Sequence, residues 1–329
     1  MKRGTLTALA AALAALAAVP LWVPGTYYVN IASQILLYAI FALGINVLAG
    51  YGGLVSLGHA GLFGIAAYTG AKILAAGGGH LAAAAALAVT VLAAAVFAVL
   101  ALRGTGLGFV MITVALGQIV WGIAYRWISL TNGDNGISIS GRPSPFGLSL
   151  AAPRSFYWAA FVVFLLALLS MVVFVASPFG AALRGTRDQP RRMNALGYNV
   201  WMIRLVAFLF SGFWTGVAGL LYLYYNQFVS PQAVALTASA EALLMVISGG
   251  TGTLLGPVVG AGLVVVVKNV ASAYIERWNF VLGAIFVLIV VFMPDGLVPG
   301  LGRLVRRSTA RWRPQAAAAA IAPRQEARR

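Results

Sequence analysis

The sequence contains no cysteine, only six acidic residues and only two histidines among its 329 residues. The lack of cysteine excludes disulfide bonds and thiolate metal sites, and it leaves the redox compartment of the protein undetermined. Charged residues make up 9% of the chain and hydrophobic residues 61%, whereas the apolar share of a soluble domain is about half. A soluble protein of this length needs polar side chains to cover its core. The composition therefore predicts a polytopic integral membrane protein.

Hydrophobic runs of membrane-spanning length recur along the chain and predict about ten transmembrane helices. They cover approximately residues 5–23, 31–50, 59–77, 81–101, 107–127, 155–176, 200–225, 235–249, 253–274 and 278–293. The first run follows a basic start, as in a signal peptide, but the many later spans favour a first helix that is retained. The eighth run is short, and the sequence SGGTG after it is typical of a turn or of a break within a helix.

Lysine and arginine outnumber the acidic residues and give the chain a formal net charge of +16. With the N-terminus inside, ten spans place most of these cations on one side, at the N-terminus, at Arg103, in 177–204 and in 301–329. Cytoplasmic loops of membrane proteins are enriched in lysine and arginine in this way. We therefore expect both termini in the cytoplasm and a disordered tail that faces the lipid. A nucleic-acid partner is not needed to explain the charge.

A charged loop interrupts the apolar runs between residues 177 and 199, with the sequence SPFGAALRGTRDQPRRMNALGYN. Ser177, which stands before a proline, predicts the N-terminus of a short helix over 178–186. Asp188 precedes another proline and predicts a second N-cap, and Gly197 predicts the end of a second short helix.

Helices this short need a partner surface to be stable. The charged loop is interpreted either as a positive-inside anchor or as a coupling element that docks into a soluble motor. The residues proposed for coupling are Arg184, Arg187, Asp188, Arg191 and Arg192.

Two glycine-rich runs, 104–109 and 248–262, lack the Gly-Lys-Ser/Thr ending of a phosphate-binding loop, so the chain itself contains no motor motif. Glycines spaced four residues apart instead let helices approach closely in lipid. The glycines predicted to pack helices are Gly212, Gly216, Gly252, Gly256 and Gly260.

Three stretches carry a resemblance to a known family. They are LLYAIFALGINVLAGYGGLVSLGHAGLFGIAAYTGA at 36–71, the charged loop with the helix after it at 177–222, and ALLMVISGGTGTLLGPVVGAGL at 242–263. Together they resemble the permeases of branched-chain amino acid ABC transporters of the LivM type, over roughly residues 30–300. The motifs Ser-Leu-Gly-His-Ala-Gly, Arg-Asp with Ala-Leu-Gly, and Gly-Gly-x-Gly-Thr occur in the order that this family shows.

The resemblance implies an all-α ABC importer permease in a bacterial inner membrane. It implies a first helix and outer loop at 1–30, a permease domain at 31–300 and a basic tail at 301–329. The partners implied are a paralogous second permease, two ATPase subunits that contact the charged loop, and a periplasmic binding protein. ATP and magnesium would be used by the ATPase, and no cofactor is expected on this chain. Two residues depart from the family pattern, Pro190 in the charged loop and Asp295 near the end of the last span.

Polar side chains within spans are costly to leave unpaired, which makes them candidates for a transport pathway. The candidates are Ser56, His59, Thr113 and Glu241. Ser56 and His59 lie in a glycine-rich break, where half-helix ends can present N–H dipoles to a carboxylate. A structural hydrogen bond is the alternative for His59. Glu241 is interpreted as a lone carboxylate for a substrate ammonium, for an arginine of another chain, or near the outer headgroups.

Other polar and aromatic residues are assigned to packing or left open. Gln118 is expected to form an interhelical hydrogen bond, and Asn46 to pack helices together. The side chains of Leu54, Phe63 and Phe109 suit either the core or the wall of an apolar passage. No metal site is predicted, because no residues near His59 have ligand spacing.

The sequence therefore predicts a subunit of a binding-protein-dependent ABC importer that takes up leucine, isoleucine and valine by alternating access. A urea or short-chain amide permease is the alternative. An ion-driven carrier would need a series of charged residues within the spans, and an enzyme would need a cluster of titratable groups. The chain shows neither pattern.

Overall fold

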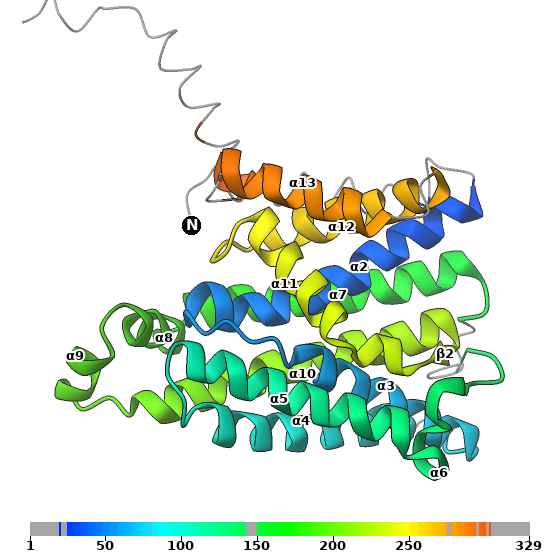
Figure 1. Cartoon of the computed structure of the whole chain (residues 1–329), viewed down its shortest axis with the longest axis horizontal. Helices are drawn as coiled ribbons and strands as arrows, with labels where there is room; N and C mark the ends of the chain where they lie inside the picture. The colour runs from blue at the N-terminus through cyan, green and yellow to red at the C-terminus, as the bar shows by residue number, and fades with distance from the viewer. Residues whose placement is uncertain are drawn as a thin grey trace, which may run out of the picture.

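The computed structural model describes residue 20, residues 25–79, 81–142, 150–274, 278–293 and 296–300, and residue 303. These residues form a bundle of helices that lie roughly along one axis (Figure 1). The predicted first span at 5–23 and the basic tail lie almost wholly outside the described residues, as does Asp295.

The elements follow one another in this order. They are α2 (Thr26–Asn46), the π-helical turn η1 (Val47–Tyr51), α3 (His59–Ala75), α4 (Leu81–Ala101), α5 (Leu107–Arg126), α6 (Ile128–Thr131), the 3-10 turn η2 (Gly133–Asn135), β1 (Ile137–Ser138), α7 (Pro153–Ala176), α8 (Pro178–Asp188), α9 (Pro190–Ala195), α10 (Val200–Asn226), β2 (Phe228–Val229), the 3-10 turn η4 (Pro231–Val234), α11 (Leu236–Gly249), α12 (Gly256–Tyr274) and α13 (Trp278–Phe292). β1 and β2 pair antiparallel at one end of the bundle.

Every hydrophobic run predicted from 31–50 onward coincides with a helix, and most of the boundaries agree within three residues. Within the described residues, six helices are long and apolar enough to cross a membrane, namely α2 with η1, α4, α5, α7, α10 and α12. The predicted number of about ten spans is therefore not confirmed. α3, α11 and α13 have 17, 14 and 15 residues, which is short for a helix that crosses the hydrocarbon alone.

Two non-helical segments, one before α3 and one before α11, explain why these two helices are short. After η1, residues 52–58 turn back into the bundle, and α3 begins beside Ser211, which lies near the middle of α10. From the opposite end, residues 227–235 return toward the bundle before α11 begins. The two helix N-termini meet inside the protein, where the backbone N–H of Ala60 donates to Ser239 Oγ at 3.0 Å.

The helices α2–α5 and α10–α13 repeat one arrangement in opposite directions. α2 and α10 are antiparallel neighbours: Gln34 Nε2 donates to the hydroxyl of Tyr225, and further along Ser211 Oγ donates to the carbonyl of Gly44. α3 packs on α4 as α11 packs on α12, and α10 packs on α4 as α2 packs on α12. Because α7 crosses the bundle once between the two sets, the second set enters with its direction reversed.

Burial places α2 and α10 at the centre of the bundle. In their most apolar windows, 78% of the residues of α2 with η1 and 61% of those of α10 are buried, against 17% for α5. The largest core cluster accordingly joins α2 and α10 to side chains of α3, α5, α7 and α11. The helices α4, α5 and α7 keep an exposed apolar face, as expected of surfaces that contact lipid or another membrane subunit.

Glycines allow the closest helix crossings. A Cβ on Gly260 of α12 would lie 1.8 Å from the carbonyl oxygen of Met245 in α11. Gly212 and Gly216 of α10 lie against Ala94 and Thr90 of α4 in the same way. These contacts bring backbones together at distances that no side chain would permit.

One predicted packing residue lies outside a helix. Gly252 was expected on the same helix as Gly256 and Gly260, but α12 begins at Gly256 and Gly252 lies in the turn before it with φ of 73°. The prediction of a helical Gly252 is wrong, because the run of glycine and threonine at 250–253 favours a turn over a helix. Gly252 nevertheless makes a close contact, with Gly50 of η1.

The crossing of α11 and α12 can be tested with two glycine-to-alanine variants. Gly260→Ala forces a methyl group against the Met245 carbonyl, so we expect a loss of about 1–3 kcal/mol, which lowers the melting temperature in detergent by several degrees. Gly122→Ala in α5 is the matched control, since a Cβ there meets no atom within 4 Å, and alanine is the better helix former. Equal melting temperatures for the two variants would contradict the close crossing.

Candidate functional site

The break between η1 and α3 is held together by His59. Its side chain is fully buried, with Nδ1 2.9 Å from Ser56 Oγ and Nε2 2.9 Å from Ser211 Oγ. Ser211 Oγ donates its own hydrogen to the carbonyl of Gly44, so it must accept from the ring. The network therefore assigns the hydrogen to Nε2 and leaves Nδ1 to accept from Ser56. A neutral imidazole satisfies every partner.

Thr113 fastens the same break to α5. Its hydroxyl donates to the carbonyl of Val110 at 2.8 Å and accepts from the backbone N–H of Leu57 at 3.3 Å. Gly58 lies so close that a Cβ there would be 2.5 Å from the Thr113 carbonyl oxygen. Ser56 and Gly58 are thus enclosed by protein, which is the condition for irregular backbone at membrane depth, whereas Gly53 and Val55 of the same break are exposed.

Three of the four candidate pathway residues therefore gather in the core. Ser56, His59 and Thr113 are 1% exposed or less, and in this conformation a substrate has no access to them. The geometry favours the structural hydrogen bond that was the alternative for His59. A pathway role for these three residues stays a prediction that would need another conformation.

Gln118 differs from its expected position. It lies on the exposed face of α5 with Met111 and Ile119, and no hydrogen bond joins it to another described residue. The expected hydrogen bond between helices is not seen among the described residues, because α5 lies at the edge of their bundle, and it stays a prediction.

Asn46 and Gly50 join the two repeats. Asn46 Nδ2 donates to the carbonyl of Thr253, and its Oδ1 accepts from the backbone N–H of Gly252 at 2.9 Å. The amide thus binds the α11–α12 turn to the end of α2 at two points. A Cβ on Gly50 would collide with both Asn46 Oδ1 and Gly252 N.

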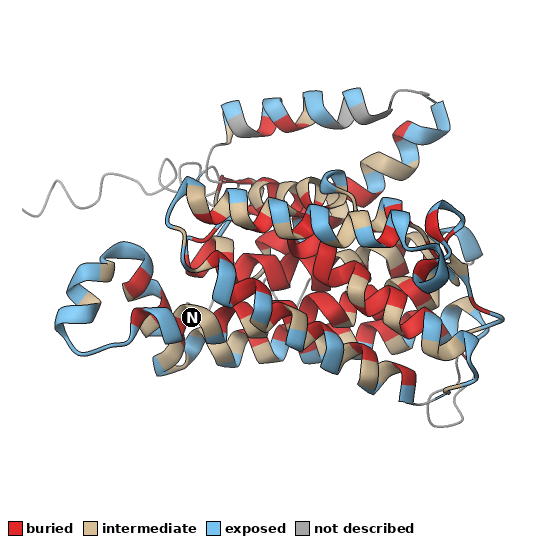
Figure 2. Cartoon of the chain, turned by 60° about the horizontal axis from the view of Figure 1, so that its bottom comes forward, coloured by how far each residue is buried: buried red, intermediate tan, exposed pale blue. Residues whose placement is uncertain are grey.

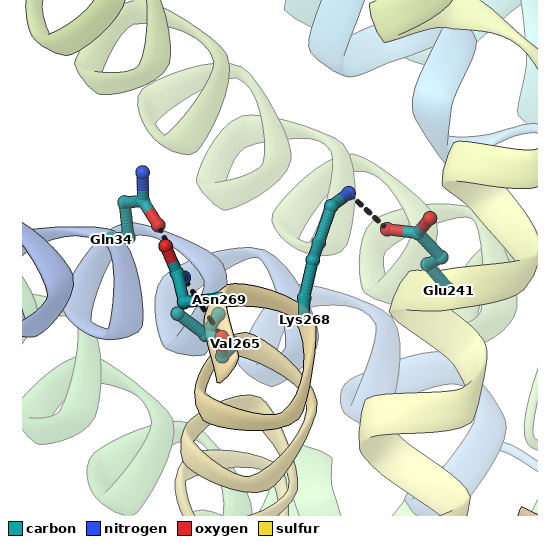
Figure 3. Close-up of polar contacts among 5 residues, drawn as sticks. All are labelled: Gln34, Glu241, Val265, Lys268 and Asn269. Atoms are coloured by element: carbon teal, nitrogen blue, oxygen red, sulfur yellow. Dashed lines mark hydrogen bonds and ion pairs between the residues drawn. The ribbon is translucent and has the colours of Figure 1, made fainter. Parts of the chain in front are cut away.

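Glu241, the fourth candidate, forms an ion pair that the sequence did not reveal. Glu241 of α11 faces Lys268 of α12, and the Lys268 ammonium donates to Glu241 Oε2 at 3.2 Å (Figure 3). The interpretation of Glu241 as a lone carboxylate is therefore wrong. Lys268 is 27 residues away in the sequence, and only the folding of α12 back on α11 brings it to Glu241.

The ion pair lies at membrane depth. Glu241 is eight residues from the end of α11, and Lys268 is twelve residues after the start of α12. At about 1.5 Å per residue, they lie about 12 and 18 Å from the turn that joins the two helices. A hydrocarbon layer is about 30 Å thick. Ionised side chains at such depth persist when they are paired and face protein or water.

A cavity of about 640 Å³ adjoins the pair. Glu241 and Lys268 supply its charges, Tyr38 and Tyr222 its phenols, and the first turn of α11 part of its wall. Its apolar lining includes Phe41, Phe63, Leu244 and Met245. Of the three residues suggested for an apolar wall, Phe63 lines this cavity, whereas Leu54 and Phe109 belong to the core.

A second cavity of about 320 Å³ lies further toward the β1–β2 end and shares Tyr38, Tyr222 and Lys268 with the first. It is lined by amide and hydroxyl side chains. Among them, Asn269 Nδ2 donates to Gln34 Oε1 at 3.1 Å (Figure 3). The two cavities are therefore neighbours, separated by Tyr38, Tyr222 and Lys268.

The charged loop forms α8 and α9, which project from the other end of the bundle (Figures 1 and 2). Ser177 caps α8 as predicted, because its Oγ accepts from the backbone N–H of Gly180 at 3.2 Å. Asp188 does not cap α9. It is the last residue of α8, and the N-cap position of α9 is taken by Gln189 without a side-chain hydrogen bond.

The second short helix begins at Pro190 itself and ends at Ala195, followed by Gly197 with φ of 84°. Proline suits the first position of a helix, so α9 starts at Pro190 without a side-chain cap. For this reason the prediction that Asp188 is an N-cap is wrong. Asn199, which the sequence reading did not single out, caps α10 by accepting from the backbone N–H of Met202 at 3.0 Å.

The arginines of the charged loop divide into two kinds. Arg187 donates to the carbonyl of Gly50, and its aliphatic stem lies over Gly53, so it ties α8 to η1 and to the start of the break after it. Arg184 donates to the carbonyl of Val175 at 3.3 Å. Arg191 and Arg192, in contrast, are exposed on α9, which buries no residue within this chain. Their charges are open to another protein.

Comparisons with known proteins agree with this geometry. The family model of the branched-chain amino acid transport system permease component matches residues 27–290. The high-affinity branched-chain amino acid transport permease protein LivM of Salmonella typhimurium is 33% identical over 298 residues, covering 82% of this chain and 70% of that protein. LivM of Escherichia coli strain K12 is 32% identical over 304 residues, with the same coverage.

The permease protein LivH of the same transport system in Salmonella typhimurium is 24% identical over 296 residues, covering 79% of this chain and 91% of LivH. No solved structure matches the chain. The family match covers most of the chain, and the described helices include six that are able to cross a membrane. The chain therefore belongs to the ABC permeases of the branched-chain amino acid transport family and is a multi-pass membrane protein.

Proposed function

We propose that this chain is the transmembrane permease subunit of a binding-protein-dependent ABC importer for leucine, isoleucine and valine. The family match over residues 27–290 carries this proposal. Transport proceeds by ATP-driven alternating access. This chain performs no bond chemistry and binds no cofactor, and ATP and magnesium are used by separate ATPase subunits.

The partners are a paralogous permease, two cytoplasmic ATPase subunits and a periplasmic binding protein. Similarity to both LivM and LivH, which are named as permeases of one transport system, supports pairing with a paralog. The exposed arginines of α9 support an ATPase contact at that end of the bundle. The opposite end, with β1 and β2, then faces the binding protein.

This assignment sets the topology. The α8–α9 end is cytoplasmic, and with a retained first helix about ten helices cross the inner membrane or enter it. Both termini are then cytoplasmic, and the basic tail after residue 300 lies along anionic lipid. The names of the relatives support branched-chain amino acids over urea or short-chain amides.

Uptake into proteoliposomes tests the function. The purified complex with its binding protein should accumulate labelled leucine only when ATP is present inside the vesicles and binding protein outside. Labelled urea, measured in parallel, should not accumulate. Uptake of urea alone would replace the substrate while keeping the architecture, and uptake that needs no ATP would refute the importer.

The two kinds of arginine in the charged loop should respond differently to substitution. Arg191→Glu with Arg192→Glu should weaken ATPase binding and lower ATP hydrolysis stimulated by the loaded binding protein by about tenfold, since reversed charges at an interface cost at least 1.4 kcal/mol. Arg187→Ala should keep the ATPase bound, because its guanidinium contacts this chain, but should lower uptake per ATP hydrolysed.

Arg103→Glu provides the matched control. Arg103 is an exposed arginine between α4 and α5, outside the charged loop, and its reversal should leave ATPase binding intact. Copurification of the subunits and ATP hydrolysis are the readouts. Unchanged hydrolysis in the α9 double variant would show that the charged loop is only an anchor.

A further inference from the structure

The ion pair of Glu241 and Lys268 is unusual because neither partner is enclosed. The Glu241 side chain is 22% exposed and the Lys268 side chain 38% exposed, and both line the 640 Å³ cavity. An ion pair that only joins two helices gains from being enclosed, since an exposed pair contributes little to stability. This pair instead presents a carboxylate and an ammonium side by side to an open space at membrane depth.

Such a pair has no net charge but a large dipole. A cation or an anion alone would neutralise one partner and leave the other uncompensated in a site of low polarity, which is costly. An uncharged polar molecule is able to form hydrogen bonds with both partners, but it brings no charge to replace the attraction that each partner loses when the pair opens. A molecule that carries both an ammonium and a carboxylate replaces both halves of the pair at once.

We propose that Glu241 and Lys268 form a transient binding site for the zwitterionic backbone of an α-amino acid. Glu241 accepts from the substrate ammonium, and Lys268 donates to the substrate carboxylate. This inference rests on the proposed function and adds to it the residues that the substrate contacts on its way through this chain.

The remaining walls fit the rest of such a substrate. The first turn of α11 borders the cavity at Ala235, Thr237 and Ala238. Helix N-termini carry N–H groups without partners in the helix and favour a carboxylate nearby. On the other walls, Phe41, Phe63 and Leu244 offer apolar surface to an aliphatic side chain. Charged groups and apolar walls are thus both present in one cavity.

The ion pair also keeps binding weak. Without substrate, Glu241 and Lys268 bond to each other at 3.2 Å, so a substrate has to open this bond before it can bind. When the substrate leaves, the pair closes again and no unpaired charge remains at membrane depth. A transporter needs this property, since a site that binds tightly releases its substrate slowly.

The absence of cysteine from the sequence makes a direct test possible. Thr237→Cys introduces a single thiol into the wall of the cavity, within the full complex reconstituted with cysteine-free partner subunits. The reaction of this thiol with a small, neutral methanethiosulfonate reagent is followed on the band of this chain, without binding protein. We expect leucine at millimolar concentration to slow the reaction at least about threefold, because the ligand occupies the cavity.

Two analogues separate the charged groups of leucine. Isoamylamine has the ammonium and side chain without the carboxylate, and 4-methylpentanoate has the carboxylate without the ammonium. Each analogue should need a concentration at least about tenfold higher than leucine to give the same protection of the thiol. This factor corresponds to about 1.4 kcal/mol for a lost charged contact. Equal protection by either analogue would overturn the zwitterion site.

Charge removal gives the second line of the test. In the Thr237→Cys background, Glu241→Gln and Lys268→Met should each abolish protection by leucine. The double variant Glu241→Gln with Lys268→Met leaves no unpaired charge in the cavity. It therefore controls for misfolding of the single variants caused by an unpaired charge. It should assemble with its partners and also lack protection. Protection that survives in the double variant would refute the assignment.

A control thiol and an uptake assay distinguish the remaining outcomes. Ser129→Cys lies in an exposed segment away from this cavity, and leucine should not change its labelling. If the Thr237→Cys complex takes up leucine but leucine gives no protection, or if the thiol does not react, the binding site is refuted while the importer stands. If the parent complex takes up no leucine at all, the proposed function itself fails.

Discussion

The structure depends on one constraint, which is that backbone polar groups outside helices need partners within the protein when they lie at membrane depth. Two chain breaks bring such groups into the bundle, at 52–58 and 227–235. In the first, the backbone N–H groups of Leu57 and Gly58 donate to Thr113 Oγ1 of α5 and to Ser56 Oγ, and His59 joins Ser56 to Ser211 of α10. The meeting of the α3 and α11 N-termini at Ser239 then joins the two breaks. Removing His59 would leave two buried hydroxyls to find new partners.

This arrangement also connects the ends of the molecule. Arg187 of α8 holds the carbonyl of Gly50, and the next residues of the chain form the break that His59 closes. Asn46, one turn earlier, holds the α11–α12 turn. Hydrogen bonds of Arg187 and Asn46 thus join the charged loop, the break before α3 and the turn between the helices that carry Glu241 and Lys268.

Local sequence signals predicted the helices well and the site poorly, for physical reasons. Hydropathy locates α4 and α5 within one residue because a lipid-facing helix has to be apolar along its length. The Ser177 cap was equally visible, since capping depends on neighbours in sequence. Lys268 was missed because its partner is 27 residues away and reaches it only when α12 folds back on α11. The exposed position of Gln118 was not visible in the sequence, because polarity alone does not tell whether a residue faces a neighbouring helix or the edge of the bundle.

The inverted arrangement of α2–α5 and α10–α13 has a consequence for biogenesis. A membrane protein is oriented during insertion by the cations that flank its spans, but two segments of like architecture and opposite direction cannot both obey the same flanking bias. A strong bias shared by both halves would insert one of them upside down. The four arginines between Gly180 and Gly197 stand in the connection between the halves, next to α7, the odd helix that reverses the direction. Cations in this connection favour the same side of the membrane for the end of α7 and the start of α10, and so set the directions of the two halves relative to each other.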